Sequence, residues 1–136
     1  MTTETRSKQS PEERVRVWLG RIAPEIRNGI GVQNPATDEF VASVPNDGAA
    51  AARGAVDRAE AAAVQWRNLV AEERGRLLLR FAERMLEEQD SLAALLTTEQ
   101  GKPLAEAAGE IRYAASFLRF AAGEATEHET AIAAGS

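Results

Sequence analysis

The stretch Leu95-Leu96-Thr97-Thr98-Glu99-Gln100-Gly101-Lys102-Pro103-Leu104-Ala105-Glu106 separates two helices in the C-terminal half of the chain. Gly101 follows the last apolar turn of the first helix, at the position where a left-handed glycine commonly ends a helix. Pro103 lies two residues further on, and proline cannot continue a helix but suits the first turn of a new one. This order predicts one helix that ends at Gln100 and another that begins near Pro103.

Apolar residues at helical spacing predict three helices after residue 47, over about residues 48–69, 71–100 and 103–128. Asp47 precedes the first of these helices and is a candidate N-cap. The inward positions of the first helix are mostly alanine, so this helix can approach a neighbour closely but buries little apolar surface. A mainly α fold is therefore predicted from residue 48 onward.

A short β-hairpin and an N-terminal arm are predicted ahead of these helices. Short apolar segments flank a turn at residues 34–39, which predicts a hairpin over residues 30–45. Residues 1–29 form the arm, a polar tail followed by a short helix. An N-cap, a first-position proline and a capping-box acid mark the start of that helix: Ser10, Pro11 and Glu13. The predicted fold class is mainly α with a short β-hairpin.

The composition predicts a thin core. The chain has 136 residues and 44% hydrophobic residues, but 27 residues are alanine. Leu, Ile, Val and Phe together number 28, roughly 21%, just above the content at which disorder becomes the default. No apolar run approaches the ~18 residues of a membrane span, and the polar start of the chain lacks a signal-peptide stretch. We therefore expect a cytoplasmic protein with no membrane partner.

The residue types exclude most catalytic chemistry from this chain. Without cysteine it cannot form a disulfide, a thiolate zinc site or a cysteine nucleophile. His128 is the lone histidine, so a multi-histidine metal site is excluded as well. Gly29-Ile30-Gly31 lacks the third glycine of the dinucleotide fingerprint and precedes a predicted strand instead of a helix. A net charge of −5 argues against a nucleic-acid partner. No catalytic, cofactor-binding or metal-ligating residue is predicted.

Two apolar stripes run along the helix predicted from Pro103. Ile111 and Leu118 belong to one, whereas Tyr113, Phe117 and Phe120 form a second, which we call the aromatic stripe. Both stripes could belong to one wide buried face. Alternatively, one stripe packs on neighbouring helices while the aromatic stripe faces a partner that this chain does not supply, since three exposed aromatics make a sizeable apolar patch.

Several motifs follow one another in an order that resembles the N-terminal segment of the aldehyde dehydrogenases. They are Asn34-Pro35-Ala36-Thr37-Asp38-Glu39, Val44-Pro45, Trp66-Arg67, Glu73-Arg74, Leu77-Leu78-Leu79-Arg80 and Thr97–Glu106. The last block, followed by residues 109–117, is most similar to the succinate-semialdehyde dehydrogenases. The resemblance covers about residues 30–125. Asp38 stands where the family usually has glycine, and aspartate tolerates a left-handed turn better than most residues.

The resemblance implies that residues 30–136 are a partial aldehyde dehydrogenase domain from the N-terminal part of a larger α/β fold. It implies that the parent enzymes oxidise a small aldehyde, here succinate semialdehyde, to the acid with NAD or NADP. They form a thiohemiacetal on cysteine, pass a hydride to the coenzyme and hydrolyse the thioester with water activated by glutamate. That cysteine, glutamate and coenzyme motif are not in this chain, which binds no cofactor on this view. By resemblance, Gly109 and Tyr113 line the substrate tunnel.

Two functional hypotheses follow. In the first, the chain is a truncated aldehyde dehydrogenase-like protein that is inactive alone. In the second, it is a non-catalytic helical interaction module that binds itself or a full-length dehydrogenase. The second hypothesis requires a partner to cover Tyr113, Phe117 and Phe120, and both hypotheses allow self-association through an exposed apolar stripe.

Overall fold

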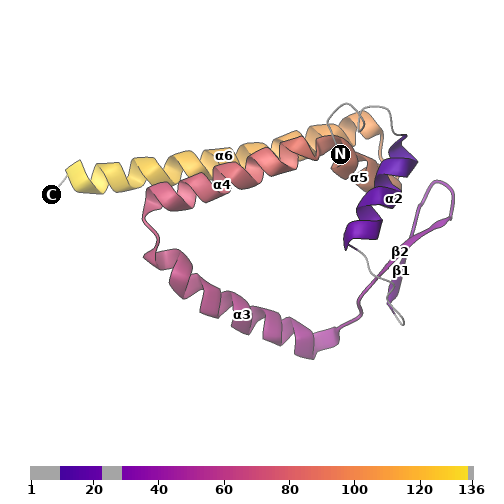
Figure 1. Ribbon diagram of the computed structural model, residues 1–136, viewed down its shortest axis with the longest axis horizontal. Coiled ribbons are helices and arrows are strands. Elements are labelled where there is room, and N and C mark those ends of the chain that lie inside the picture. The colour runs from indigo at the N-terminus through magenta and orange to yellow at the C-terminus, as the bar shows by residue number, and fades with distance from the viewer. Residues whose placement is uncertain (1–9, 23–28, 135–136) are drawn as a thin grey trace. The chain divides into compact units, whose positions relative to one another are not determined.

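The computed structural model describes residues 10–22 and 29–134, which are mainly helical with one two-stranded antiparallel hairpin (Figure 1). The elements in chain order are α2 (Pro11–Ile22), β1 (Ile30–Gln33), β2 (Phe40–Val44), α3 (Gly48–Asn68), α4 (Ala71–Glu87), α5 (Gln89–Gln100) and α6 (Leu104–Ala134). They belong to two compact units. The first combines residues up to 46 with 87–112, and the second combines 47–86 with residues from 113 onward. The predicted fold class is confirmed.

The start of α2 has the capping box predicted from the sequence. The Ser10 backbone N–H donates to Glu13 Oε2 at 3.0 Å, and the Glu13 N–H donates to Ser10 Oγ at 3.2 Å. Pro11 occupies the first helical position. Two N–H groups that the helix itself cannot pair are thereby satisfied.

The turn between β1 and β2 is held by Asn34 and uses a left-handed aspartate. Asn34 Oδ1 accepts the Ala36 N–H at 2.9 Å, and the Asn34 carbonyl accepts the Asp38 N–H at 2.8 Å. Asp38 has φ 58°, which is the left-handed turn conformation that aspartate was predicted to tolerate here. The register pairs Ile30 with Val44 and shifts after Val32.

The helix predicted over residues 71–100 is wrong in one respect, because the structure divides it at Glu88. Glu88 has φ −98° and ψ 9°, and its carbonyl accepts the Leu92 N–H at 2.9 Å as α5 begins. Two physical causes favour the break. Acidic residues at the end of α4 oppose the helix dipole, and the Glu88 carboxylate accepts a hydrogen bond from Trp18 Nε1 at 3.4 Å.

Three other boundaries or caps differ from the sequence prediction. Asp47 makes no side-chain cap hydrogen bond, because its own backbone is already helical with φ −80° and ψ −14°. α3 ends at Asn68, one residue early, since Leu69 is extended. α6 continues to Ala134, beyond the predicted end at residue 128, through an alanine-rich segment of high helix propensity.

The end of α5 depends on glycine for two reasons. Gly101 has φ 74°, and its N–H donates to the Thr97 carbonyl at 2.8 Å, which confirms the predicted left-handed helix end. A Cβ at this position would lie 3.0 Å from Pro35 Cγ of the hairpin turn. Lys102 Nζ then forms a 2.5 Å ion pair with Glu110 Oε1, which joins the connection to the first turns of α6. The α5 end, the hairpin turn and the start of α6 are thus fixed to one another.

The core is as thin as the composition predicts. Among the described residues, the buried hydrophobic side chains are Val15, Ala71, Ala82, Ala93, Ala94, Ala107, Ala115 and Ala122. Small side chains at these positions allow helices to approach closely, but each buries little apolar surface. Packing in the part of the chain that the structure describes therefore rests on close backbone approach more than on large buried side chains.

Candidate functional site

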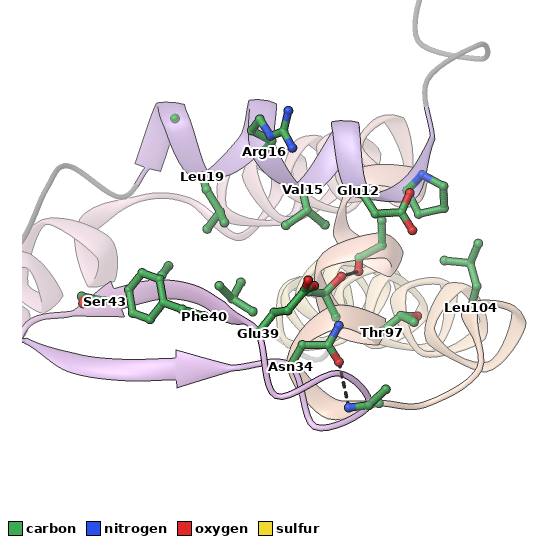
Figure 2. Close-up of a pocket in the computed structure, with 18 residues that line it drawn as sticks. Glu12, Val15, Arg16, Leu19, Asn34, Glu39, Phe40, Ser43, Thr97 and Leu104 are labelled. Carbon is green, nitrogen blue, oxygen red and sulfur yellow. Dashed lines mark hydrogen bonds between the residues drawn. The ribbon is translucent and has the colours of Figure 1, made fainter.

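The first unit contains a cavity of about 940 Å³ between α2, β2 and the end of α5 (Figure 2). Its apolar lining residues are Val15, Leu19, Phe40, Val41, Ala42, Ala94 and Leu104. Its polar and charged lining residues include Glu12, Arg16, Asn34, Glu39, Ser43, Thr97 and Thr98. An apolar space of this size with a few polar groups has the general character of a binding site.

Two polar contacts and one apolar contact hold α2 over this cavity. Val15 is buried at 5% exposure, and α2 packs against α5. Arg14 Nη1 forms an ion pair with Asp90 Oδ2 at 2.9 Å, and Trp18 Nε1 donates to Glu88 at 3.4 Å. Both polar contacts lie at the beginning of α5, so they hold α2 beside α5 while Val15 and Leu19 point toward β2 (Figure 2).

One hydroxyl group in the cavity wall has no partner. Thr97 Oγ1 is buried without a hydrogen bond, although threonine hydroxyls normally find a partner when buried. Its neighbour Thr98 donates to the Ala94 carbonyl at 2.9 Å, and Asn34 Oδ1 is already used in the hairpin turn. The Thr97 hydroxyl is therefore a buried polar group without a hydrogen-bond partner among the described residues.

The charged residues of the cavity lie toward its edge. Hydrogen bonds from its own backbone N–H and from the Ser10 hydroxyl lower the pKa of the Glu12 carboxyl below its ordinary value. Glu12 therefore stays ionised at neutral pH. Glu39 is exposed and pairs with the Thr37 hydroxyl at 3.2 Å. No cluster that could hold a metal ion is found in the described residues. These residues can bind a molecule.

The residues that the resemblance places in a substrate tunnel lie elsewhere, on α6. Gly109 is half-buried, and Tyr113 follows one turn later at 66% exposure. Neither residue lines the cavity. Tyr113 contacts Phe117 edge to face, with ring centroids 4.7 Å apart and an interplanar angle of 68°.

The aromatic stripe is exposed, so the alternative of one wide buried face is wrong. Phe117 is 55% exposed and Phe120 is 68% exposed, whereas Ile111 and Leu118 are half-buried. Up to residue 125, where side-chain burial is described, the fully buried positions of α6 are alanines. The helix thus has a small-residue side that packs and an aromatic side that faces outward.

The sequence did not predict the cavity, because its walls come from three segments far apart along the chain. Thr97 and Thr98 lie within a predicted helix, where nothing in the sequence pattern predicts a binding site. Val15 and Leu19 were predicted only to belong to the apolar face of a helix. A pairing of the 11–22 helix with the 89–100 helix would have been needed to place them together. The aromatic stripe, in contrast, is local to one helix and was visible as a pattern.

Comparisons with known proteins agree with the motif order. The model of the aldehyde dehydrogenase family matches residues 22–135. Glutarate-semialdehyde dehydrogenase of Pseudomonas putida is 55% identical over 96 residues, 71% of this chain and 20% of that protein. NADP-dependent succinate-semialdehyde dehydrogenase of Escherichia coli is 52% identical over 109 residues, 79% of this chain and 22% of that protein.

Solved structures give the same result. A crystal structure of an E. coli NADP-dependent enzyme matches with a TM-score of 0.70 and 50% identity, over 71% of this chain and 20% of the other. An aldehyde dehydrogenase from Brucella melitensis biovar abortus matches with a TM-score of 0.69 and 38% identity. The chain spans about one fifth of the length of the relatives it matches. No helix in the described residues is long and apolar enough to cross a membrane.

Proposed function

Since this chain belongs to the aldehyde dehydrogenase family, we propose that it represents the N-terminal structural part of an enzyme that oxidises a short semialdehyde to the acid with NAD or NADP. The observation that carries the proposal is the match over residues 22–135 to that family, with relatives named for glutarate and succinate semialdehyde. The role is structural because the 136-residue chain contains no cysteine to attack an aldehyde. We place this function in the cytoplasm of a bacterium.

In this proposal, Gly109 and Tyr113 line the path of the aldehyde. Gly109 has no side chain, and an added Cβ would lie 3.8 Å from Arg112 Nη2, an ordinary van der Waals contact. Tyr113 lies one turn further along the same side of α6 and exposes two thirds of its surface. Its ring offers an apolar face to an aliphatic chain and a hydroxyl to a terminal carboxylate.

A chimera tests this role. Residues 30–125 replace the matching segment of the P. putida glutarate-semialdehyde dehydrogenase, and the chimera is expected to keep kcat/KM within about tenfold of that enzyme, because core exchanges at similar volume are tolerated. In the chimera, Tyr113→Ala is expected to raise KM about tenfold with little change in kcat, since it removes binding contacts and no reacting group. Arg119→Ala, at an exposed site on the same helix, is the control.

Two results would contradict the proposal. One is a folded chimera that binds coenzyme but oxidises no semialdehyde. The other is a Tyr113→Ala variant whose KM equals that of the Arg119→Ala control. Steady-state kinetics with both semialdehydes, together with circular dichroism of each variant, separate these outcomes from simple misfolding.

The exposed aromatic stripe favours a second candidate function, an interaction module. Tyr113, Phe117 and Phe120 present three aromatic rings on one side of α6. Aromatic side chains dominate the energetics of protein interfaces, and a large exposed apolar patch on a monomer marks an interaction site. We propose that a second copy of this chain covers the stripe when the rest of a dehydrogenase is absent.

Phe117→Asp is expected to weaken this self-association at least tenfold, because it places a charge at the centre of an apolar contact. The measurement is the dimer dissociation constant from sedimentation equilibrium. Ala105→Asp is the matched control, since it adds the same charge at an exposed position near the start of α6. Equal dissociation constants for the two variants would exclude the aromatic stripe as the interface.

A further inference from the structure

The cavity of the first unit lies along the unpaired edge of β2. Four consecutive residues of that strand line it, Phe40 to Ser43, whereas no residue of β1 does. Neighbouring side chains of a strand point to opposite faces, so a space that touches four residues in a row reaches the backbone edge as well as one face. β1 occupies the other edge of β2 in the two-stranded sheet that the described residues form.

We infer that this cavity binds an extended peptide segment, which adds to β2 as a third strand beneath α2. A strand with one paired edge has a row of free N–H and C=O groups, and these groups are a template for another strand. A two-stranded hairpin is also marginal in water, and a third strand would stabilise it. Of the elements around the cavity, α2 lies ahead of the family match except for its last residue, whereas β2 and α5 lie within it.

The walls of the cavity suit alternate side chains of such a peptide. Val15 and Leu19 of α2 point toward β2 from one side, and Phe40 faces them from the hairpin (Figure 2). Apolar side chains at every second position of the peptide would fill this space.

The two carboxylates of the cavity select one end of the peptide, whereas the third charged lining residue, Arg16, points away from β2 (Figure 2). Glu12 and Glu39 lie toward the Thr97 end of the cavity, while Leu19 and Phe40 mark its apolar end (Figure 2). The lowered pKa of Glu12 keeps that carboxylate charged at neutral pH. We therefore assign the occupant as a strand with alternating apolar residues. Its lysine or arginine stands at the terminus that lies beside Glu12 and Glu39.

Fluorescence anisotropy of the 136-residue protein with a labelled probe tests the inference. The probe is the hexapeptide Val-Thr-Val-Thr-Val-Lys, and two control peptides carry proline at both threonines or glutamate in place of lysine. Proline removes backbone N–H groups, so the proline peptide is expected to bind at least tenfold more weakly. The glutamate peptide is expected to bind several-fold more weakly, because it faces Glu12 and Glu39.

Protein variants locate the binding site. Leu19→Arg is expected to weaken binding at least tenfold, whereas Val17→Arg on the same helix is the control, since Val17 is exposed and outside the cavity. Circular dichroism checks that α2 is retained in each variant.

Each remaining outcome overturns the inference. Equal binding of the proline peptide would mean apolar adhesion without strand pairing. Equal binding to Leu19→Arg and to the unchanged protein would place the peptide at another surface. No binding of the probe at millimolar concentration would mean that the cavity does not accept an extended strand.

Discussion

The purified 136-residue protein is expected to form no NADH or NADPH from succinate semialdehyde or glutarate semialdehyde above a blank without protein. The mechanism that the family resemblance implies begins with a cysteine thiolate attacking the aldehyde carbon, and the chain contains no cysteine. Without this covalent step no tetrahedral intermediate forms beside the coenzyme, so no hydride is transferred from it to the coenzyme. The chain is therefore expected to lack the whole rate acceleration of an intact enzyme, which is at least about a millionfold over the uncatalysed reaction.

The measurement is the absorbance of reduced nicotinamide over hours at high protein concentration, with each coenzyme in turn. The chimera that contains residues 30–125 is the positive control, since it supplies the missing nucleophile and coenzyme site around the same segment. Turnover that elutes with the 136-residue protein in gel filtration would contradict the proposal. Activity that elutes at the size of a larger host protein would be contamination.

The parts of the fold that the sequence predicted correctly are those governed by local backbone chemistry. The Ser10–Glu13 capping box, the left-handed Asp38 and the left-handed Gly101 each follow from hydrogen bonds or steric limits within a few residues. Such signals do not depend on the rest of the molecule. They therefore define where elements begin and end even in a chain with a thin core.

The parts that could not be predicted depend on contacts between distant segments. The break at Glu88 involves a hydrogen bond from Trp18, which lies 70 residues away in the chain. The cavity needs α2, β2 and α5 to meet, and the unpartnered Thr97 hydroxyl is visible only after they do. Periodicity alone likewise could not decide which stripe of α6 is buried, because both stripes have helical spacing.

The aromatic stripe leads to the largest expected effect on stability. Burial of each large apolar side chain contributes roughly 1.5–3 kcal/mol relative to exposure. Tyr113, Phe117 and Phe120 are all more than half exposed, so about 3–6 kcal/mol of stabilisation is not realised in the isolated chain. This amount comes close to the lower end of the net stability of an ordinary domain. The buried alanines do not compensate, since each adds little apolar area.

The isolated protein is therefore expected to keep strong helical circular dichroism at low temperature but to lose it gradually on heating, without a sharp transition. The signal is measured at several protein concentrations, because self-association through the aromatic stripe stabilises only the folded form and raises the apparent Tm with concentration. Phe117→Asp is expected to remove that concentration dependence, while Ala105→Asp retains it. A monomer that melts cooperatively above about 60 °C, as self-sufficient domains do, would contradict this account. Its helices would then close a core without any partner, and the exposed aromatic stripe would not limit the stability of the chain.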